Sequence, residues 1–285
     1  MDPGRECMKT IAYLGPRGSF TNKAVQILYP EGHHLAYSSI PDCMDAVVSG
    51  EVECCVVPLE NSTEGSVHST VDYLFRMNEL YIVKEYDLPI KQYLMMHPSQ
   101  VGKPIDMVFS HPQALAQCHD FLRERELSLL EETTSTSKAA EEVKTYRNQP
   151  YAAIGPDTCA EAYGLTIIES NIQDSDLNHT RFVSLSKQPY EFDLRKKACS
   201  IKSTWYLILP ENHAGALHQV LSVFAWRRLN LSKIESRPLK TELGHYFFIL
   251  DINEHEEAVM MQGAKQELEA LGCILFQKGS YPVMN

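Results

Sequence analysis

Short apolar segments alternate with amphipathic helical patterns through more than half of the chain, and this alternation limits the possible folds more than any other feature. Thr10–Leu14 has the pattern of a buried strand, and Cys54–Leu59 has that of a second one. Between them, Phe20–Leu28 has the pattern of a helix with Ser19 as its N-cap. Strands that alternate with helices form mainly parallel sheets covered on both faces, so we predict an α/β fold.

The alternating units are too numerous for one sheet. Further strands are predicted at 80–84, 93–96, 107–110, 151–154 and 165–168, and further helices at 67–75, 113–125, 137–146 and after Pro156. We therefore expect two α/β lobes with a cleft between them, and we expect the chain to rejoin the first sheet near residue 167. Ligands usually bind in such a cleft.

The pattern breaks at residues 186–200, where Pro189 and a run of charged residues indicate a linker. Beyond it the predicted order is strand, helix, strand, strand, helix, strand, with a hairpin turn at the sequence KTELG. This is the order of a ferredoxin-like βαββαβ domain. We predict a first domain over 9–186, a linker over 187–200 and a ferredoxin-like domain over 201–281.

The overall charge restricts the partners. Among 285 residues the formal net charge is −11, which argues against binding to nucleic acid or to an anionic membrane, but not against a small anionic substrate held by a local cation. The 8 cysteines show no C-x-x-C spacing, so we expect buried thiols in a reducing compartment and no metal site. Because the sequence has no signal-peptide pattern and no apolar stretch of membrane-spanning length, we expect a cytoplasmic protein.

Polar residues gather where predicted strands end and helices begin. Glu60, Asn61 and Ser62 follow the strand at 54–59, and Ser110 ends another, with Gln117 two turns into the next helix. Such positions hold ligand groups in open α/β sheets, although helix capping explains them equally well.

The sequence GPRGSF at 15–20 fits neither the G-x-G-x-x-G nor the P-loop spacing. It suits a carboxylate at a helix start with Arg17 alongside, or simply a capped turn. The hydroxyls of TTSTS at 133–137 fit capping. The sequence therefore predicts no cofactor loop.

The sequence NHTRF at 178–182 places Thr, Arg and Phe at the start of an apolar run. β-Branched and aromatic residues begin strands well, which is sufficient to explain them locally. The motifs together supply hydroxyls, amides and one or two arginines, without a Ser-His-Asp set or metal ligands. The chemistry of this chain must then rely on positioning and hydrogen bonds.

Five motifs in this order make the chain resemble bacterial prephenate dehydratases: GPRGSFT, VVPLENSTEGSV, SHPQALAQC, AAIGPDTCAEAYGL and NHTRF. The segment 211–238 resembles the ACT regulatory domain that follows the catalytic domain in that family. The similarity covers residues 9–282. It implies a two-lobed catalytic domain like the lobes of periplasmic binding proteins, followed by an ACT domain.

The resemblance implies conversion of prephenate to phenylpyruvate, water and CO2 in phenylalanine biosynthesis, without a cofactor. It gives Thr180 the role of donating a hydrogen bond or a proton to the leaving hydroxyl. Arg181 would pair with a carboxylate or order the loop, and Phe182 would anchor the motif in the core. The implied substrate-binding residues are Asn61, Ser62, Ser110, Gln117, Glu60 and Asn178.

The resemblance also implies feedback regulation by L-phenylalanine, bound between two ACT domains of a homodimer or homotetramer. The implied effector-binding residues are Asn212, Gly215, Ala216, Leu217, Glu235, Ser236, Arg237 and Pro238. Glycine at a helix start lets a ligand approach the free backbone N–H groups, which favours a carboxylate.

Two other functions remain open at this point. An arogenate dehydratase differs only in accepting an amine in place of the keto group on the substrate side chain. A two-lobed binding protein with an ACT sensor would bind without catalysis. Assays with prephenate and with arogenate separate the three possibilities.

Overall fold

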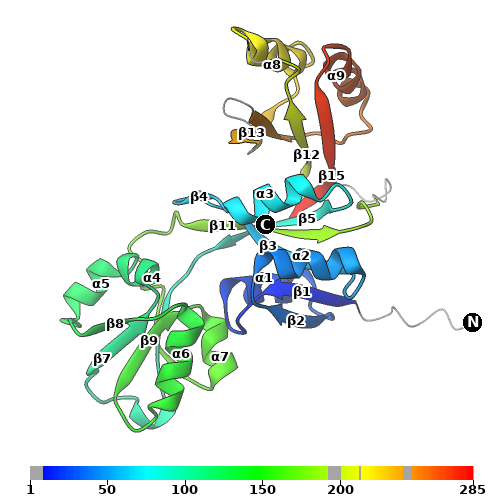
Figure 1. Ribbon diagram of the computed structural model, residues 1–285. Helices are drawn as coiled ribbons and strands as arrows, with labels where there is room; N and C mark the ends of the chain where they lie inside the picture. The colour runs from blue at the N-terminus through cyan, green and yellow to red at the C-terminus, as the bar shows by residue number, and fades with distance from the viewer. Residues whose placement is uncertain (1–8, 192–199, 212, 240–245, 285) are drawn as a thin grey trace, which may run out of the picture.

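The computed structural model describes residues 9–191, 200–211, 213–239 and 246–284 (Figure 1). Two α/β lobes lie at one end, and a domain with two helices on one face of its sheet lies at the other. The predicted turn at KTELG lies outside the described residues, and so does most of the 187–200 linker.

The first lobe is built on the strands β5-β11-β3-β1-β2, in that order. Their bounds are β1 Thr10–Leu14, β2 His33–Tyr37, β3 Cys54–Asn61, β5 Tyr81–Pro89 and β11 His179–Ser186, and the short β4, Gly65–Ser66, pairs with β3. Its helices are α1 Phe20–Leu28, α2 Ile40–Ser49 and α3 His68–Arg76. Ser19 caps α1 as predicted, because its side chain accepts the N–H of Asn22.

The second lobe carries the five-stranded sheet β10-β6-β9-β7-β8. Its strands are β6 Tyr93–Met96, β7 Met107–Ser110, β8 Leu130–Glu132, β9 Tyr151–Gly155 and β10 Thr166–Ser170. A 3-10 turn, η1, covers Pro98–Gln100, and the helices are α4 Pro112–Ala116, α5 His119–Glu124, α6 Thr136–Thr145 and α7 Asp157–Tyr163. The helix predicted over 113–125 is thus two short helices that meet at Cys118.

Two expectations about the lobes were wrong in detail. The sheets are mixed, because β11 runs antiparallel to both β3 and β5, and β6 runs antiparallel to β9 and β10. The chain also rejoins the first sheet later than residue 167. Thr166–Ser170 still pairs with β6 in the second lobe, and only β11 returns to the first. Alternation of strands and helices does not reveal the direction of such a returning strand.

The C-terminal domain has the predicted ferredoxin-like order. It consists of β12 Ser200–Ile208, α8 Ala216–Trp226, β13 Leu231–Pro238, β14 Tyr246–Ile252, α9 Val259–Ala270 and β15 Ile274–Met284. The strand order is β13-β14-β12-β15, with every neighbouring pair antiparallel. Trp205, Phe224 and Leu268 are buried between this sheet and its two helices.

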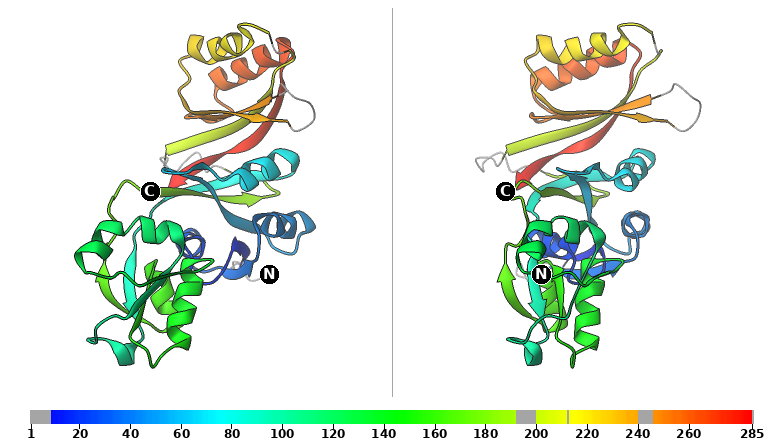
Figure 2. Two further views of the ribbon diagram at one scale, coloured as in Figure 1. Left: turned by 60° about the vertical axis from the view of Figure 1, so that its left-hand side comes forward. Right: turned by 90° about the vertical axis from the view of Figure 1, so that its left-hand side faces the viewer.

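The C-terminal domain shares both its sheet and its core with the first lobe. The end of β15 pairs in parallel with β5, which joins the two sheets into one of 10 strands. Helix α3 lies between the two domains (Figure 2). There Phe75 stacks on Phe247 with ring centroids 4.0 Å apart, in a cluster that also buries Tyr206 and Leu74.

No helix in the described part of the chain combines the length and the apolar character needed to cross a bilayer.

Candidate active site

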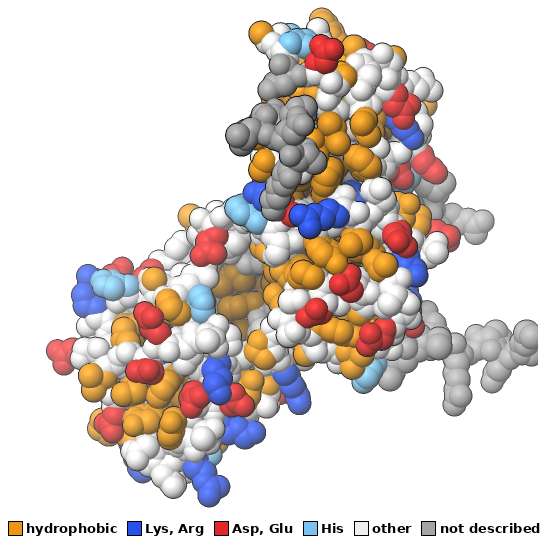
Figure 3. Space-filling model, viewed as in Figure 1, with side chains coloured by type: hydrophobic (Ala, Val, Ile, Leu, Met, Phe, Trp, Pro, Cys, Tyr) orange, Lys and Arg blue, Asp and Glu red, His pale blue; other side chains and the backbone are white. Residues whose placement is uncertain are grey.

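A pocket of about 370 Å³ lies between the two lobes, a size typical of sites for small molecules. Figure 3 shows the surface hollowed between them. The lobes touch beside the pocket, where Lys23 of α1 forms an ion pair of 2.7 Å with Asp157 of α7. The polar residues that line the pocket are Ser19, Thr21, Asn61, Glu64, Gln92, His111, Gln113, Gln117, Thr134, Ser135, Thr136, Asn178 and Thr180.

The hydroxyl of Thr180 is held by Asn61. These two residues face each other across β11 and β3, and Asn61 Nδ2 donates to Thr180 Oγ1 at 2.9 Å. The same Nδ2 group also donates to Asn178 Oδ1 at 2.8 Å. Because Asn61 Oδ1 accepts the backbone N–H groups of Thr63 and Glu64, the amide has only one orientation that satisfies all its partners. The hydroxyl oxygen of Thr180 therefore accepts this bond, and no described residue accepts the proton of the hydroxyl.

Helix starts meet at the pocket from both lobes. Ser19 caps α1 in the first lobe, and Ser135 caps α6 in the second by accepting the N–H of Lys138. The backbone N–H groups of the first helical turn carry partial positive charge and favour a carboxylate. Among the described residues that line this pocket, none is Lys or Arg, and Arg17 is exposed outside it. The helix starts therefore remain the candidate anion site, whereas Arg17, which the sequence placed alongside the start of α1, is not among the residues that line the pocket.

His111 also lines the pocket and caps α4. Its Nδ1 accepts the backbone N–H of Gln113 at 3.3 Å. A neutral imidazole whose Nδ1 is an acceptor carries its proton on Nε2. His111 therefore presents one N–H donor at this wall of the pocket.

The other predicted substrate-binding residues differ in where they lie. Asn178 and Gln117 line the pocket, and Gln117 Oε1 accepts an N–H of Gln92. Ser110 is fully buried, and its hydroxyl donates to the carbonyl of Ile154. Ser62 lies just outside the pocket lining, where its hydroxyl donates to the carbonyl of Leu177 and accepts the N–H of His179. Ser62 and Ser110 thus hold the backbone around the site.

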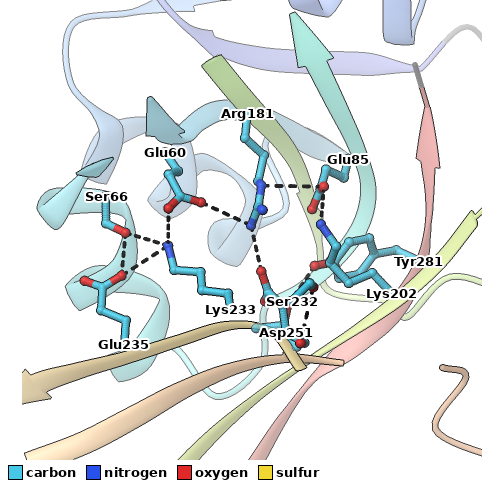
Figure 4. A network of polar contacts seen from close by, with 11 residues as sticks. Glu60, Ser66, Glu85, Arg181, Lys202, Ser232, Lys233, Glu235, Asp251 and Tyr281 are labelled. Atoms are coloured by element: carbon cyan, nitrogen blue, oxygen red, sulfur yellow. Dashed lines mark hydrogen bonds and ion pairs between the residues drawn. The ribbon is translucent and has the colours of Figure 1, made fainter. Parts of the chain in front are cut away.

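Glu60 and Arg181 lie on the opposite face of the same two strands, against the C-terminal domain (Figure 4). Arg181 Nη1 pairs with Asp251 at 2.6 Å, and Glu60 pairs with Lys233 at 3.1 Å. Phe182 is buried beside Ile11 in the core of the first lobe. Only Thr180 of the Thr-Arg-Phe sequence reaches the pocket.

The predicted effector residues lie in two places. Gly215 precedes α8 with φ of +87°, and Ala216 and Leu217 open that helix. Glu235, Ser236, Arg237 and Pro238 end β13, where Glu235 accepts the Ser66 hydroxyl and Arg237 pairs with Asp72 of α3. Asn212 lies outside the described residues.

His111, Gln113 and the hydroxyls at 134–136 were missed as individual site residues, although their motifs were recognised. Each of them sits at a helix N-terminus, where capping is a sufficient local explanation. Their position after strands of the second lobe was the signal that they line the cleft.

Comparison with known proteins identifies a family that this chain matches. The family model described as prephenate dehydratase matches residues 11–190. The prephenate dehydratase of Bacillus subtilis is 48% identical over 278 residues, which cover 95% of this chain and 98% of that protein. A chloroplast protein of Arabidopsis thaliana named arogenate dehydratase/prephenate dehydratase 2 is 33% identical, over 96% of this chain and 72% of that protein.

Among solved structures, the prephenate dehydratase of Arthrobacter aurescens in complex with L-Phe has a TM-score of 0.84 and 32% identity to this chain. The match covers 96% of this chain and 89% of that one. The likeness thus extends through the C-terminal domain.

Proposed function

The chain belongs to the prephenate dehydratase family, and on that premise we propose that the pocket between its two lobes is where prephenate becomes phenylpyruvate, water and CO2. The observation that carries this proposal is the Thr180 hydroxyl, which faces the pocket with its oxygen already hydrogen-bonded to Asn61. The Thr180 hydroxyl can then donate a hydrogen bond to an oxygen of the substrate in the pocket.

The reaction requires one proton for the leaving hydroxide and a substrate that is held in the reactive orientation. The bond between the ring and its carboxylate breaks, the electron pair moves through the ring, and the C4–O bond breaks as the ring becomes aromatic. The departing hydroxide must take up a proton to leave as water. A hydrogen bond from Thr180 to that oxygen, strengthened as negative charge develops, contributes roughly 10²–10³-fold to the rate.

His111 is the second donor that we place in this reaction. A threonine hydroxyl is a very weak acid, so Thr180 orients and stabilises the leaving oxygen more readily than it gives up a proton. The Nε2–H group of a neutral His111 is likewise a hydrogen-bond donor and not an acid. We propose that His111 donates a second hydrogen bond to the leaving oxygen, directly or through a water molecule, and that the proton that completes the departing water comes from solvent.

The two carboxylates of prephenate are bound without a salt bridge in this proposal. The starts of α1 and α6 provide free N–H groups from opposite lobes. A dianion that contacts both helix starts draws the lobes together, which removes water from the reacting centre and strengthens each hydrogen bond there.

The test is an assay of the purified protein with prephenate and, separately, with arogenate. Prephenate turnover to phenylpyruvate with a kcat/KM at least tenfold above that for arogenate is the expected result. Because the Arabidopsis relative is named for both substrates, arogenate is the second candidate. Tight binding of prephenate without turnover would instead identify a binding protein.

We further propose that residues 201–281 bind L-phenylalanine and reduce the activity of the lobes. The structural relative from Arthrobacter aurescens was solved with L-Phe. The first turn of α8 has no side-chain cap, and its N–H groups beyond Ala216, which itself donates to the carbonyl of His213, suit this carboxylate. The proposed effector-binding residues are Asn212, Gly215, Ala216, Leu217, Glu235, Ser236, Arg237 and Pro238.

The C-terminal domain would associate with a second copy of this chain. β13 lies at an edge of the 10-stranded sheet, and Ile234 and Tyr246 are nearly half exposed there. Exposed apolar residues at a sheet edge favour association with another chain. A homodimer or homotetramer measured by analytical ultracentrifugation is the expected state.

A further inference from the structure

Two neighbouring cross-strand pairs on β3 and β11 face in opposite directions. In one pair, Asn61 and Thr180 face the pocket. In the next, Glu60 and Arg181 face the C-terminal domain (Figure 4). The register between β11 and β3 shifts directly after Arg181, and such bulges often re-aim side chains beside active sites.

The C-terminal domain holds the second pair with charges of its own. Asp251 of β14, only 1% exposed, accepts from Arg181 at 2.6 Å. Lys233 of β13 pairs with Glu60 at 3.1 Å and has a side chain that is 10% exposed. These contacts come from two different strands of the domain, so they hold β3 and β11 at two separate points.

From this arrangement we infer that Asp251 and Lys233 of the C-terminal domain position the catalytic hydroxyl of Thr180 by holding Arg181 and Glu60 in place. The inference rests on the proposed role of Thr180. It makes Arg181 and Glu60 positioning residues, because they act through the backbone of their neighbours and contact no reacting atom. The domain that we propose to sense phenylalanine then also completes the geometry of the active site.

The strength of these contacts follows from their burial. Burial opposes the charge of Arg181, but the carboxylates of Glu85, Asp251 and Glu60 outweigh it and raise the pKa of the guanidinium above its ordinary value. A buried charge that loses its partner is costly, so the surrounding strands move to restore one. Displacement of a catalytic group by about 1 Å can reduce a rate by roughly 10²-fold.

The network also reaches the proposed effector segment. Lys233 pairs with Glu235 as well as with Glu60, and Ser66 contacts both Lys233 and Glu235. Burial acts to raise the pKa of Glu235, but the hydrogen bonds from Ser66 and Lys233 outweigh it and lower the pKa. One ammonium group is thus shared between the strand of Asn61 and the strand of the effector residues.

The test compares Asp251→Asn and Lys233→Met with the wild type in the prephenate assay. Asparagine has the shape of aspartate and keeps a group that can accept from Thr204, whereas methionine keeps most of the lysine stem. We expect kcat to fall about tenfold or more in each variant, while KM for prephenate stays within threefold. In the double variant, the loss should be smaller than the product of the two single losses, because both changes act on one strand pair.

The controls separate positioning from general damage. Glu267→Gln removes a carboxylate that pairs with Arg227 at 2.6 Å in the same domain, away from the catalytic lobes, and should leave kcat within twofold. Lys233→Arg should restore most of the activity that Lys233→Met loses. Thermal unfolding of every variant shows whether it is folded at the assay temperature.

A folded Asp251→Asn and a folded Lys233→Met with wild-type kcat would overturn the inference. A fall in kcat no greater than that of Glu267→Gln would do the same. Should Asp251→Asn fail to fold, Lys233→Met and its arginine rescue decide alone. Wild-type protein that does not convert prephenate would reject the proposed function, an outcome distinct from either of these.

Discussion

The catalytic role that we propose for Thr180 depends on its hydroxyl alone, so this group can be removed by mutation with little change in packing. Thr180→Val should reduce kcat about 10²-fold or more while the protein stays folded, since valine has nearly the shape of threonine. Asn61 Nδ2 keeps its contacts with Asn178 and with the carbonyl of His179 when the hydroxyl is removed. Steady-state kinetics and thermal unfolding check this. Thr180→Ser, which keeps the hydroxyl, is the matched control, and a Thr180→Val enzyme within threefold of wild type would refute the role.

His111 can be tested without loss of its structural role. Asparagine caps helices well, so His111→Asn should keep the start of α4 intact while it removes the Nε2–H donor. We expect kcat to fall at least tenfold. Should the variant keep the rate of the wild type, His111 does not stabilise the leaving oxygen.

At the scale of elements, the start of α8 is the part of the proposed effector site where a ligand would approach the backbone. Gly215 has φ of +87°, and a Cβ added there would meet no atom of the described residues within 4 Å, its two chain neighbours aside. That open space is available to a ligand carboxylate, and a valine side chain would fill it. Gly215→Val should therefore abolish phenylalanine binding measured by calorimetry, yet leave the uninhibited kcat within about twofold.

The control for this substitution must share its backbone strain. A non-glycine residue in the left-handed region costs about 1–2 kcal/mol wherever it occurs. Gly164, the C-cap of α7 with φ of +70° and equally open surroundings, provides the match in the second lobe. Gly164→Val should lose similar stability and still bind phenylalanine. Retained binding in Gly215→Val would move the effector site elsewhere.

At the scale of the whole molecule, the shared core makes the two domains interdependent. From the sequence alone, a cut in the 186–200 linker is predicted to leave an active but less stable catalytic fragment that phenylalanine no longer inhibits. The structure shows that removal of the C-terminal domain uncovers Phe75, which stacks on Phe247 and Tyr206. Burial of such a side chain contributes roughly 1.5–3 kcal/mol.

We therefore expect the isolated 9–186 fragment to unfold at least 10 °C below the intact chain, or to aggregate. A chain cut once between Glu191 and Ser200 should behave differently, because β15 still pairs with β5 and the core stays covered. Its two pieces should elute together and remain active. Size-exclusion chromatography and thermal unfolding test both statements. An isolated fragment as stable and as active as the whole chain would contradict them.

Local chemistry in the sequence determined the elements and the kind of site. Strands such as Tyr93–Met96 and Met107–Ser110 were predicted with their observed bounds, because apolar runs between turn residues have few alternatives. The βαββαβ order of the C-terminal domain was equally clear from periodicity. The prediction that Thr180 serves the site came from the family motif, and its hydroxyl does line the pocket.

Only the tertiary structure decided which way each residue faces and what lies opposite. Asn61 and Glu60 are neighbours in sequence, yet one lines the pocket and the other pairs with the C-terminal domain. Successive side chains of a strand point to opposite faces of the sheet, so neighbours in sequence lie on different faces. Which of the two faces lines the cleft depends on the strands that pair with that strand. The returning strand β11 and the close packing of β13 and β14 against the first lobe arise from contacts between residues far apart in the chain. Local patterns carry no record of those contacts, so the link between the active site and the C-terminal domain became visible only in the folded molecule.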